Sequence, residues 1–202
     1  GTVYAMKRGM EEFSEDQVID LQLLQGRGVF GIEMRIVDEN DSELPWDGVA
    51  SGALKVRGPW VAKGYYGLSD VPGHEDCPVD KDGWFNTGDV AAITPDGFLQ
   101  ITDRTKDVIK SGGEWISSIE IETAAVNHPD IAEAAVIGRY HPKWTERPLL
   151  IAVAQPGRSL QKRAVLEFLT DKLHKMALPD DVVFTDELPH TATGKINKLG
   201  LR

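Results

Sequence analysis

The sequence of 202 residues has one cysteine, Cys77, and no long apolar run. A single cysteine excludes an internal disulfide framework and fits a reducing compartment, so we expect a cytoplasmic protein. We find no apolar stretch of membrane-spanning length and no signal-like apolar region near the first residue. Cys77 lies in a polar loop, where we expect an unreactive thiol rather than a catalytic one.

Metal-binding patterns are also lacking. The five histidines, at positions 74, 128, 141, 174 and 190, are scattered, and none has a second ligand at the spacing of a zinc site. A phosphate-binding loop of the GxxxxGK[ST] type is absent as well. We therefore predict no zinc site, and a nucleotide site built from this chain alone would be incomplete.

Positive charge is scarce in the first half of the chain. Residues 1–102 hold 8 basic and 18 acidic side chains, whereas residues 103–202 hold 14 of each. The acidic half argues against nonspecific nucleic-acid binding, which needs a basic face. The change in charge at Asp103 suggests two parts with different surroundings. With 41% hydrophobic and 27% charged residues, the sequence is typical of a globular protein.

Local patterns predict short strands in the first half and a mixed unit in the second. Before Asp103 we expect a short helical or irregular piece over 11–25, strands over Val29–Asp38, Gly52–Arg57 and Phe98–Ile101, and a glycine-bounded loop over Gly58–Gly67. After it we expect helices over Ile116–Asn127 and Ser159–Met176 and strands over Ile131–Ile137, Leu149–Ala154 and Val182–Phe184. The fold class is therefore α+β.

Three groups of residues suggest chemistry, and each has an ordinary alternative. Asp89 could bind ribose hydroxyls, but after Thr87-Gly88 a carboxylate more often caps a turn. The run Lys110–Trp115 (KSGGEW) offers paired glycines and a cation for a ligand, or a tight turn entering a helix at Ile116. Lys195, near the end of the chain, is by itself best explained as a solvated surface charge.

Taken together, three segments carry a family resemblance. Trp84–Val90 (WFNTGDV), Asp103–Glu122 (DRTKDVIKSGGEWISSIEIE) and Pro189–Ile196 (PHTATGKI) resemble, in order and spacing, the last third of AMP-forming acyl-CoA synthetases acting on medium or long acyl chains. These enzymes belong to the adenylate-forming superfamily. The form IKSGGEWIS is closer to acyl-CoA synthetases than to luciferases or peptide synthetases. Segments between Gly26 and Gly67 extend the resemblance over nearly the whole chain.

The resemblance implies a role for several residues. Lys195 falls on the catalytic lysine, and Asp89 falls on the aspartate that binds ribose. Lys106 falls on the hinge position. The resemblance implies that Arg104 contacts a phosphate or the ribose. It implies that the nucleotide is also contacted by Lys106, Lys110 and Trp115. Gly112 and Gly113 would line the pantetheine path of CoA. A guanidinium fork suits phosphate oxygens, which supports Arg104.

The resemblance also implies an organisation and a set of ligands. Residues 1–105 would be the end of the large adenylating domain, including a distorted β-barrel subdomain, and residues 106–202 a small mobile lid. ATP, CoA and a carboxylic acid would be the substrates, with Mg²⁺ held by residues upstream of this sequence. The family's Ser/Thr/Gly-rich phosphate loop does not occur here. We therefore expect the chain to begin inside a larger protein and to be inactive alone.

Two alternatives remain open at the level of sequence. One is another adenylate-forming enzyme, such as a peptide-synthetase module or a luciferase-like oxidase. The other is a non-catalytic interaction fragment in which Lys195 and Asp89 are inherited but idle. The run from His141 to Pro148 also resembles fatty-acyl synthetases, but we assign it no catalytic role. The acid and the oligomeric state are not predicted, and a homo-oligomer remains open.

Overall fold

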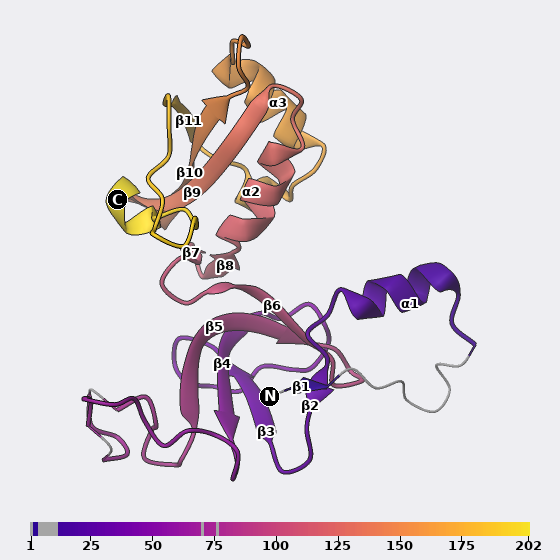
Figure 1. Ribbon diagram of the computed structural model, residues 1–202, viewed down its shortest axis with the longest axis vertical. Helices are drawn as coiled ribbons and strands as arrows, with labels where there is room; N and C mark the ends of the chain where they lie inside the picture. The colour runs from indigo at the N-terminus through magenta and orange to yellow at the C-terminus, as the bar shows by residue number, and fades with distance from the viewer. Residues whose placement is uncertain (1, 4–11, 70, 76) are drawn as a thin grey trace. The chain divides into compact units, whose positions relative to one another are not determined.

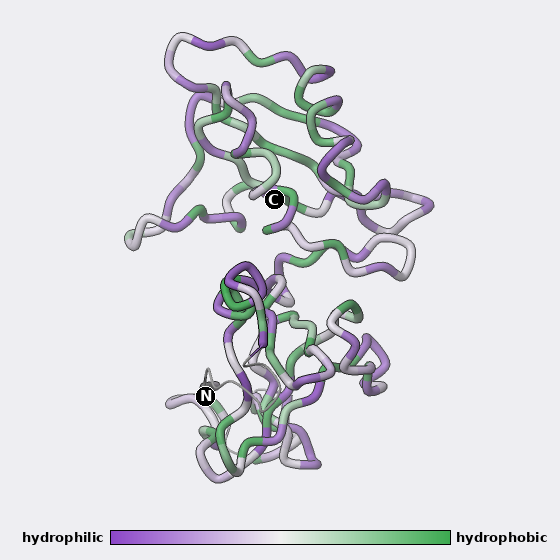
Figure 2. Tube along the Cα trace, turned by 90° about the vertical axis from the view of Figure 1, so that its right-hand side faces the viewer, coloured by the Kyte–Doolittle hydropathy of each residue, from purple (hydrophilic) through white to green (hydrophobic). Residues whose placement is uncertain are grey.

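The computed structural model describes residues 2–3, 12–69, 71–75 and 77–202 (Figure 1). The chain divides into two compact units, residues 1–105 and 106–202, which we describe separately. Figure 2 shows hydrophobic stretches running through the inside of the units, with hydrophilic loops around them. No helix in the described part of the chain combines the length and the apolar character that a membrane span requires.

The first unit is built on an antiparallel four-stranded sheet. Its strands follow the order β3 (Glu33–Val37), β4 (Gly52–Arg57), β5 (Phe85–Ile93) and β6 (Leu99–Arg104). Side chains on one face of this sheet form the core, because successive residues of a strand point to opposite faces: Ile36, Leu54, Ala91, Ile93 and Leu99. Since β3 and β6 are the two ends of the strand order, the described strands form an open sheet and not the expected distorted barrel.

Two smaller elements precede this sheet. Strand β1 (Thr2–Val3) pairs with β2 (Arg27–Gly28), and helix α1 spans Glu15–Gln22. Ser14 and Gln17 close a capping box at the start of α1. The helical piece expected over 11–25 is thus shorter, and position 11 lies outside the described residues. The strand expected over Val29–Asp38 begins later, at Glu33, after Gly31 adopts a φ of 83°.

The second unit is a five-stranded mixed sheet with β10 (Thr145–Ala154) at its centre. Strand β10 pairs antiparallel with β9 (Ile131–His141) and β7 (Ile109–Ser111), and parallel with β11 (Asp181–Phe184). Strand β8 (Glu114–Ile116) extends the sheet beyond β7. This arrangement confirms the α+β class, and the strands predicted in this half are all present.

Helices and the C-terminal segment complete two cores. Helices α2 (Ser118–Val126) and α3 (Lys162–Thr170) pack against the strand residues Ala134, Val136, Leu150 and Ala152. The alternate strand residues Ala135, Ile137 and Ile151 contact Leu188, Ile196 and Leu201 of the C-terminal segment. That segment ends in a short 3-10 helix, η2 (Lys198–Leu201), which lies beside β9 (Figure 1).

The predicted helices differ from the observed ones at their ends. Helix α2 begins at Ser118 rather than Ile116, because residues 114–116 pair with β7 and the Ser117 side chain accepts the N–H of Glu120. Helix α3 ends at Thr170, although its apolar spacing continues to Met176. His174 then takes an extended conformation and begins a separate 3-10 turn, η1 (Lys175–Ala177). Leu173 is buried even though it follows the helix.

Candidate functional site

Asp89 and Arg104 face each other on neighbouring strands of the first unit. They are register partners in the β5–β6 ladder, and Arg104 Nη1 lies 3.0 Å from Asp89 Oδ1. Asp89 is 20% exposed and Arg104 is 58% exposed. The part of β5 just before Asp89 is held by the Thr87 side chain, because Thr87 Oγ1 accepts the N–H of Asp89 at 3.1 Å and donates to the Leu54 carbonyl at 3.0 Å. The carboxylate is therefore available for a ligand and is oriented by a guanidinium.

Trp84, just before β5, is fixed by a charged cluster. The guanidinium carbons of Arg35 and Arg57 lie 4.4 and 4.5 Å from the centre of the Trp84 ring. The Asp80 carboxylate accepts the N–H of Trp84 at 2.9 Å and the Lys55 ammonium at 3.0 Å. Burial acts to raise the pKa of Asp80, but these two donors outweigh it and the pKa lies below its usual value. These contacts thus hold Trp84 in place directly before β5, the strand that carries Asp89.

The glycine pair of the second unit is the turn of a β-hairpin. Gly112 and Gly113 have φ values of 60° and 89°, and the flanking residues Ser111 and Glu114 are paired. Two successive positive φ angles are what a two-residue hairpin turn requires, and glycine supplies them without steric cost. Across the hairpin, Lys110 Nζ lies 5.0 Å from the centre of the Trp115 ring. The run Lys110–Trp115 is thus a hairpin, and not a turn that leads directly into a helix.

The two glycines have different surroundings. A Cβ on Gly112 would lie 2.7 Å from the Trp144 ring, and the Gly112 N–H donates to the Trp144 carbonyl at 2.9 Å. A Cβ on Gly113 would meet no atom within 4 Å. Gly112 is therefore required by packing inside the unit, whereas the space beside the Gly113 backbone is open.

Three residues in and just after the β9–β10 turn hold this hairpin in place, namely Trp144, Glu146 and Arg147. Glu146 Oε2 accepts the Lys110 N–H at 3.0 Å. Arg147, only 11% exposed, donates to the Ser111 hydroxyl at 3.3 Å and to the carbonyls of Met176 and Leu178 at 2.7 and 2.9 Å. The sequence predicts no catalytic role for this segment. Its only local signal was a tryptophan followed by a Glu-Arg-Pro run.

Lys195 is exposed on a short loop of the second unit. The Thr191 N–H donates to the Lys195 carbonyl at 2.7 Å, and the Lys195 N–H donates to the Thr191 hydroxyl at 3.2 Å. Gly194, with φ of 80°, allows the chain to turn there. Within the described residues the Lys195 ammonium has no hydrogen-bond or ion-pair partner, so it is free to meet an anion.

Lys106 is the first residue of the second unit and is exposed. Its carbonyl accepts Arg202 Nη2 at 2.8 Å, and the same guanidinium nitrogen lies 2.9 Å from Asp107 Oδ1. The predicted site residues thus group as Asp89 with Arg104 in one unit, and Lys110 with Trp115 in the other. Among the described residues no cluster of three His, Cys, Asp or Glu side chains could hold a metal ion.

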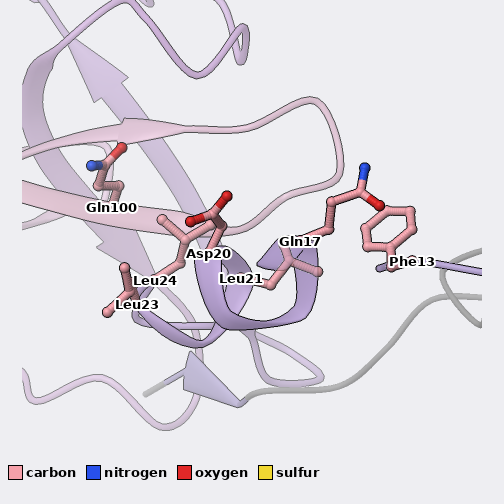
Figure 3. Close-up of a pocket in the computed structure, with 7 residues that line it drawn as sticks. All are labelled: Phe13, Gln17, Asp20, Leu21, Leu23, Leu24 and Gln100. Carbon is pink, nitrogen blue, oxygen red and sulfur yellow. The ribbon is translucent and has the colours of Figure 1, made fainter. Parts of the chain in front are cut away.

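An open depression of about 460 Å³ lies elsewhere in the first unit (Figure 3). It is formed by α1, the residues next to its ends and Gln100 of β6, and its lining has a single carboxylate: Phe13, Gln17, Asp20, Leu21, Leu23, Leu24 and Gln100. None of the predicted site residues lines it. It does not provide the convergent charges that a nucleotide site needs.

Comparison with known proteins gives the context of these residues. Residues 120–195 match the family of AMP-binding enzyme C-terminal domains. The chain is 53% identical over 178 residues to the 3-methylmercaptopropionyl-CoA ligase of Ruegeria lacuscaerulensis, covering 88% of the chain and 32% of that protein. It is 48% identical to the medium-chain-fatty-acid–CoA ligase of Ectopseudomonas oleovorans, covering 95% of the chain and 34% of that protein.

The chain is also similar to a solved structure. The crystal structure of ATP-bound MatB from Rhodopseudomonas palustris has a TM-score of 0.73 and 32% identity, covering 89% of the chain and 35% of that protein. The chain therefore spans about a third of the length of the curated relatives that it matches.

Proposed function

The chain belongs to the adenylate-forming superfamily and carries an AMP-binding enzyme C-terminal domain, and from this we propose that it acts as the C-terminal part of a longer AMP-forming acyl-CoA ligase. The observation that carries the proposal is an exposed Lys195 ammonium, on a loop inside that domain, with no partner in the described part of the chain. An oriented Asp89 carboxylate in the preceding unit supports it. Residues 1–105 would end the large domain, and residues 106–202 would be the lid.

The proposed reaction has two steps. In the first, a carboxylate oxygen of the acid attacks the α-phosphorus of ATP, the bond to the β-phosphate oxygen breaks, and pyrophosphate leaves. This attack brings two anions together, so a positioned Lys195 ammonium lowers its barrier. Asp89 would bind the ribose hydroxyls and Arg104 a phosphate or ribose oxygen. Lys110, Trp115 and Lys106 would contact the nucleotide from the second unit.

In the second step the CoA thiol attacks the acyl carbon of the adenylate and AMP leaves. The lid would turn about Lys106 between the steps, since Lys195 and the CoA path cannot share one face of the active site. The open backbone at Gly113 suits the pantetheine arm, and Gly112 supports that backbone through its contact with Trp144. Mg²⁺ would be held with ATP by residues upstream of this sequence, as the family resemblance implies.

The test is carboxylate-dependent ATP–pyrophosphate exchange in the complete protein, over acids from sulfur-containing propionates to long-chain fatty acids. We expect exchange with a medium-chain or similar acid. We also expect the complete protein to act in the cytoplasm. Lys195→Ala should lower the exchange rate about 100- to 1,000-fold while ATP still binds. Lys172→Ala, an exposed lysine of the same unit, is the matched control. Unchanged exchange in Lys195→Ala would overturn the role of Lys195, and no exchange with any acid would favour an interaction fragment.

A further inference from the structure

Lys198, three residues after Lys195, is an unusual lysine because its charge is largely buried. The side chain is 13% exposed, and Nζ lies 2.7 Å from Glu122 Oε1 and 2.7 Å from the Ser118 hydroxyl. Glu122 is itself only 17% exposed, and the same oxygen accepts the N–H of Val136 at 2.7 Å. One ammonium therefore joins the C-terminal segment to the first turn of α2 and, through Glu122, to strand β9.

The loop that carries Lys195 has few other attachments. Its own hydrogen bonds run between Thr191 and Lys195, and they fix the shape of the loop but not its place on the unit. The His190–Ile196 bridge and the bond from the Asn197 N–H to the Pro189 carbonyl join the residues before the loop to the residues after it, within the same segment. The attachments of this segment to the rest of the unit are apolar contacts of Leu188, Ile196 and Leu201 and a few charged contacts. His190 lies 3.5 Å from Glu133, and Arg202 contacts the Lys106 carbonyl and Asp107. The Lys198–Glu122 pair is the one of these charged contacts, among the described residues, in which both side chains are largely buried.

These two kinds of attachment differ in precision. Apolar contacts hold a segment against a surface but allow it to slide, because they have no preferred direction. A charge-assisted hydrogen bond fixes distance and direction together, and it is stronger where water is largely excluded. Lys198 meets two oxygens of α2 at 2.7 Å, so it sets where the following and preceding residues lie.

We propose that Lys198 is a positioning residue for Lys195, which it keeps at the place that the adenylation step requires. This inference rests on the proposed function. Lys198 does not touch the reacting atoms in this scheme and acts through the backbone of residues 195–198. Because the thioester step does not use Lys195, loss of Lys198 should slow adenylation selectively.

The experiment separates the two half-reactions in the complete protein. The variants are Lys198→Met, Lys198→Arg, Lys195→Ala and, as the matched control, Lys162→Met, which removes an ammonium paired with Asp181 on a more exposed part of the same unit. The first readout is ATP–pyrophosphate exchange with its kcat and KM for ATP. The second is thioester formation from preformed acyl-adenylate and CoA.

For Lys198→Met we expect kcat for exchange to fall about 10- to 100-fold, since misplacement of a reacting group by about 1 Å has effects of that size. KM for ATP and thioester formation from the adenylate should change less than about twofold. Lys198→Arg should recover most of the exchange, because a guanidinium can reach the same two oxygens. Lys162→Met should behave as the unsubstituted protein.

A general loss of structure is distinguished by its effect on both steps. Equal losses in exchange and in thioester formation, or full exchange in Lys198→Met while Lys195→Ala is impaired, would overturn the positioning role. Full exchange in Lys195→Ala would instead overturn the proposed function itself. Amide hydrogen exchange adds a check that does not depend on activity, because Lys198→Met should speed exchange at residues 191–197 and leave that of α3 unchanged. No change at residues 191–197 would also overturn the inference.

Discussion

The two units hold their candidate site residues in different ways. Asp89 and Arg104 stand on paired strands, where the β5–β6 ladder sets their separation. Gly112, Gly113 and Lys195 stand on turns, where the backbone has few partners beyond the turn itself. In the second unit, positions are set by side chains that are not themselves candidates for ligand contact. Those side chains are Trp144, Glu146, Arg147 and Lys198.

This difference matches the motion proposed for the second unit. A ladder gives fixed geometry to the residues that are proposed to bind the nucleotide throughout the reaction. A turn supported from behind presents its backbone or a single side chain outward, so it can approach a ligand and leave again. It follows that substitutions behind the turns should act strongly in the second unit, whereas the first unit should tolerate loss of one side chain of its ion pair.

The glycine pair should show the largest effect on stability. Gly112→Ala places a methyl group against the Trp144 ring in a left-handed backbone conformation, so we expect the free energy of unfolding of the second unit to fall by about 3 kcal/mol. Gly113→Ala meets only the backbone cost, about 1 kcal/mol. Urea unfolding of both variants, followed by far-ultraviolet circular dichroism, measures the difference. Equal losses would show that Trp144 does not constrain the turn.

Substitution of Arg104 should affect binding more than folding. Arg104→Met removes an exposed ion pair, so stability should change by less than about 0.5 kcal/mol. Its loss frees the Asp89 carboxylate and removes a proposed phosphate contact, and we expect ATP affinity of the complete protein to fall about tenfold, or about 1.4 kcal/mol. Isothermal titration calorimetry measures the affinity. Arg158→Met, which removes another exposed ion pair with Asp130, is the control and should leave ATP binding intact.

The sequence predicted best the elements that carry their own signals. Strand β4 coincides with the alternating run Gly52–Arg57, and the Ser117 cap marks the start of α2 to within two residues of the prediction. The β7–β8 hairpin was missed, because a glycine pair fits a turn before a helix equally well. Pairing of Ser111 with Thr145 of β10, far along the chain, decides between the two. The predicted helix over Ser159–Met176 is longer than α3, because Leu173 continues the apolar spacing and is buried although the helix has already ended.

The candidate site divides in the same way. Asp89, Lys195 and the glycine pair were predicted through family motifs, which are short local stretches of sequence. The sequence did not single out Lys198, because a lysine near the end of a chain looks like a surface charge until its partners on α2 are known. The Trp144–Arg147 support was seen but given no role for the same reason. Long-range contacts that position a motif leave little trace in the motif itself.

The charged cluster behind Trp84 predicts a pH dependence for the first unit. The pKa of Asp80 is depressed in the folded state, so its stabilising contribution is present above the unfolded value of about 4 and is lost as pH falls through the folded pKa. The free energy of unfolding should therefore fall as pH drops below about 4. Asp80→Asn should lower stability at pH 7 by about 1 kcal/mol and flatten this dependence.

The second unit provides the contrast. Lys162 lowers the pKa of Asp181 with help from the Val182 N–H, but both side chains are considerably exposed. Salt screens exposed pairs strongly and partly buried ones weakly. In about 1 M salt the contribution of Asp181 should disappear while that of Asp80 persists. Urea unfolding of Asp80→Asn and Asp181→Asn at low and high salt compares them, and equal salt sensitivity would contradict the distinction.

The smallest expected effect concerns the hairpin that carries the glycine pair. Lys110→Met removes the ammonium that lies over the Trp115 ring but keeps an apolar side chain on the strand, so stability should fall by only about 0.5 kcal/mol. In the complete protein, Lys110→Met should lower nucleotide affinity more than it lowers stability, because Lys110 is a proposed ligand contact. The control is Lys143→Met, which removes the ammonium over Trp144 and should lower stability alone. Parallel urea unfolding and ATP titration of the two variants measure this. If both variants lose stability and neither loses affinity, Lys110 supports the hairpin only. The second unit then contacts the nucleotide through fewer side chains than proposed.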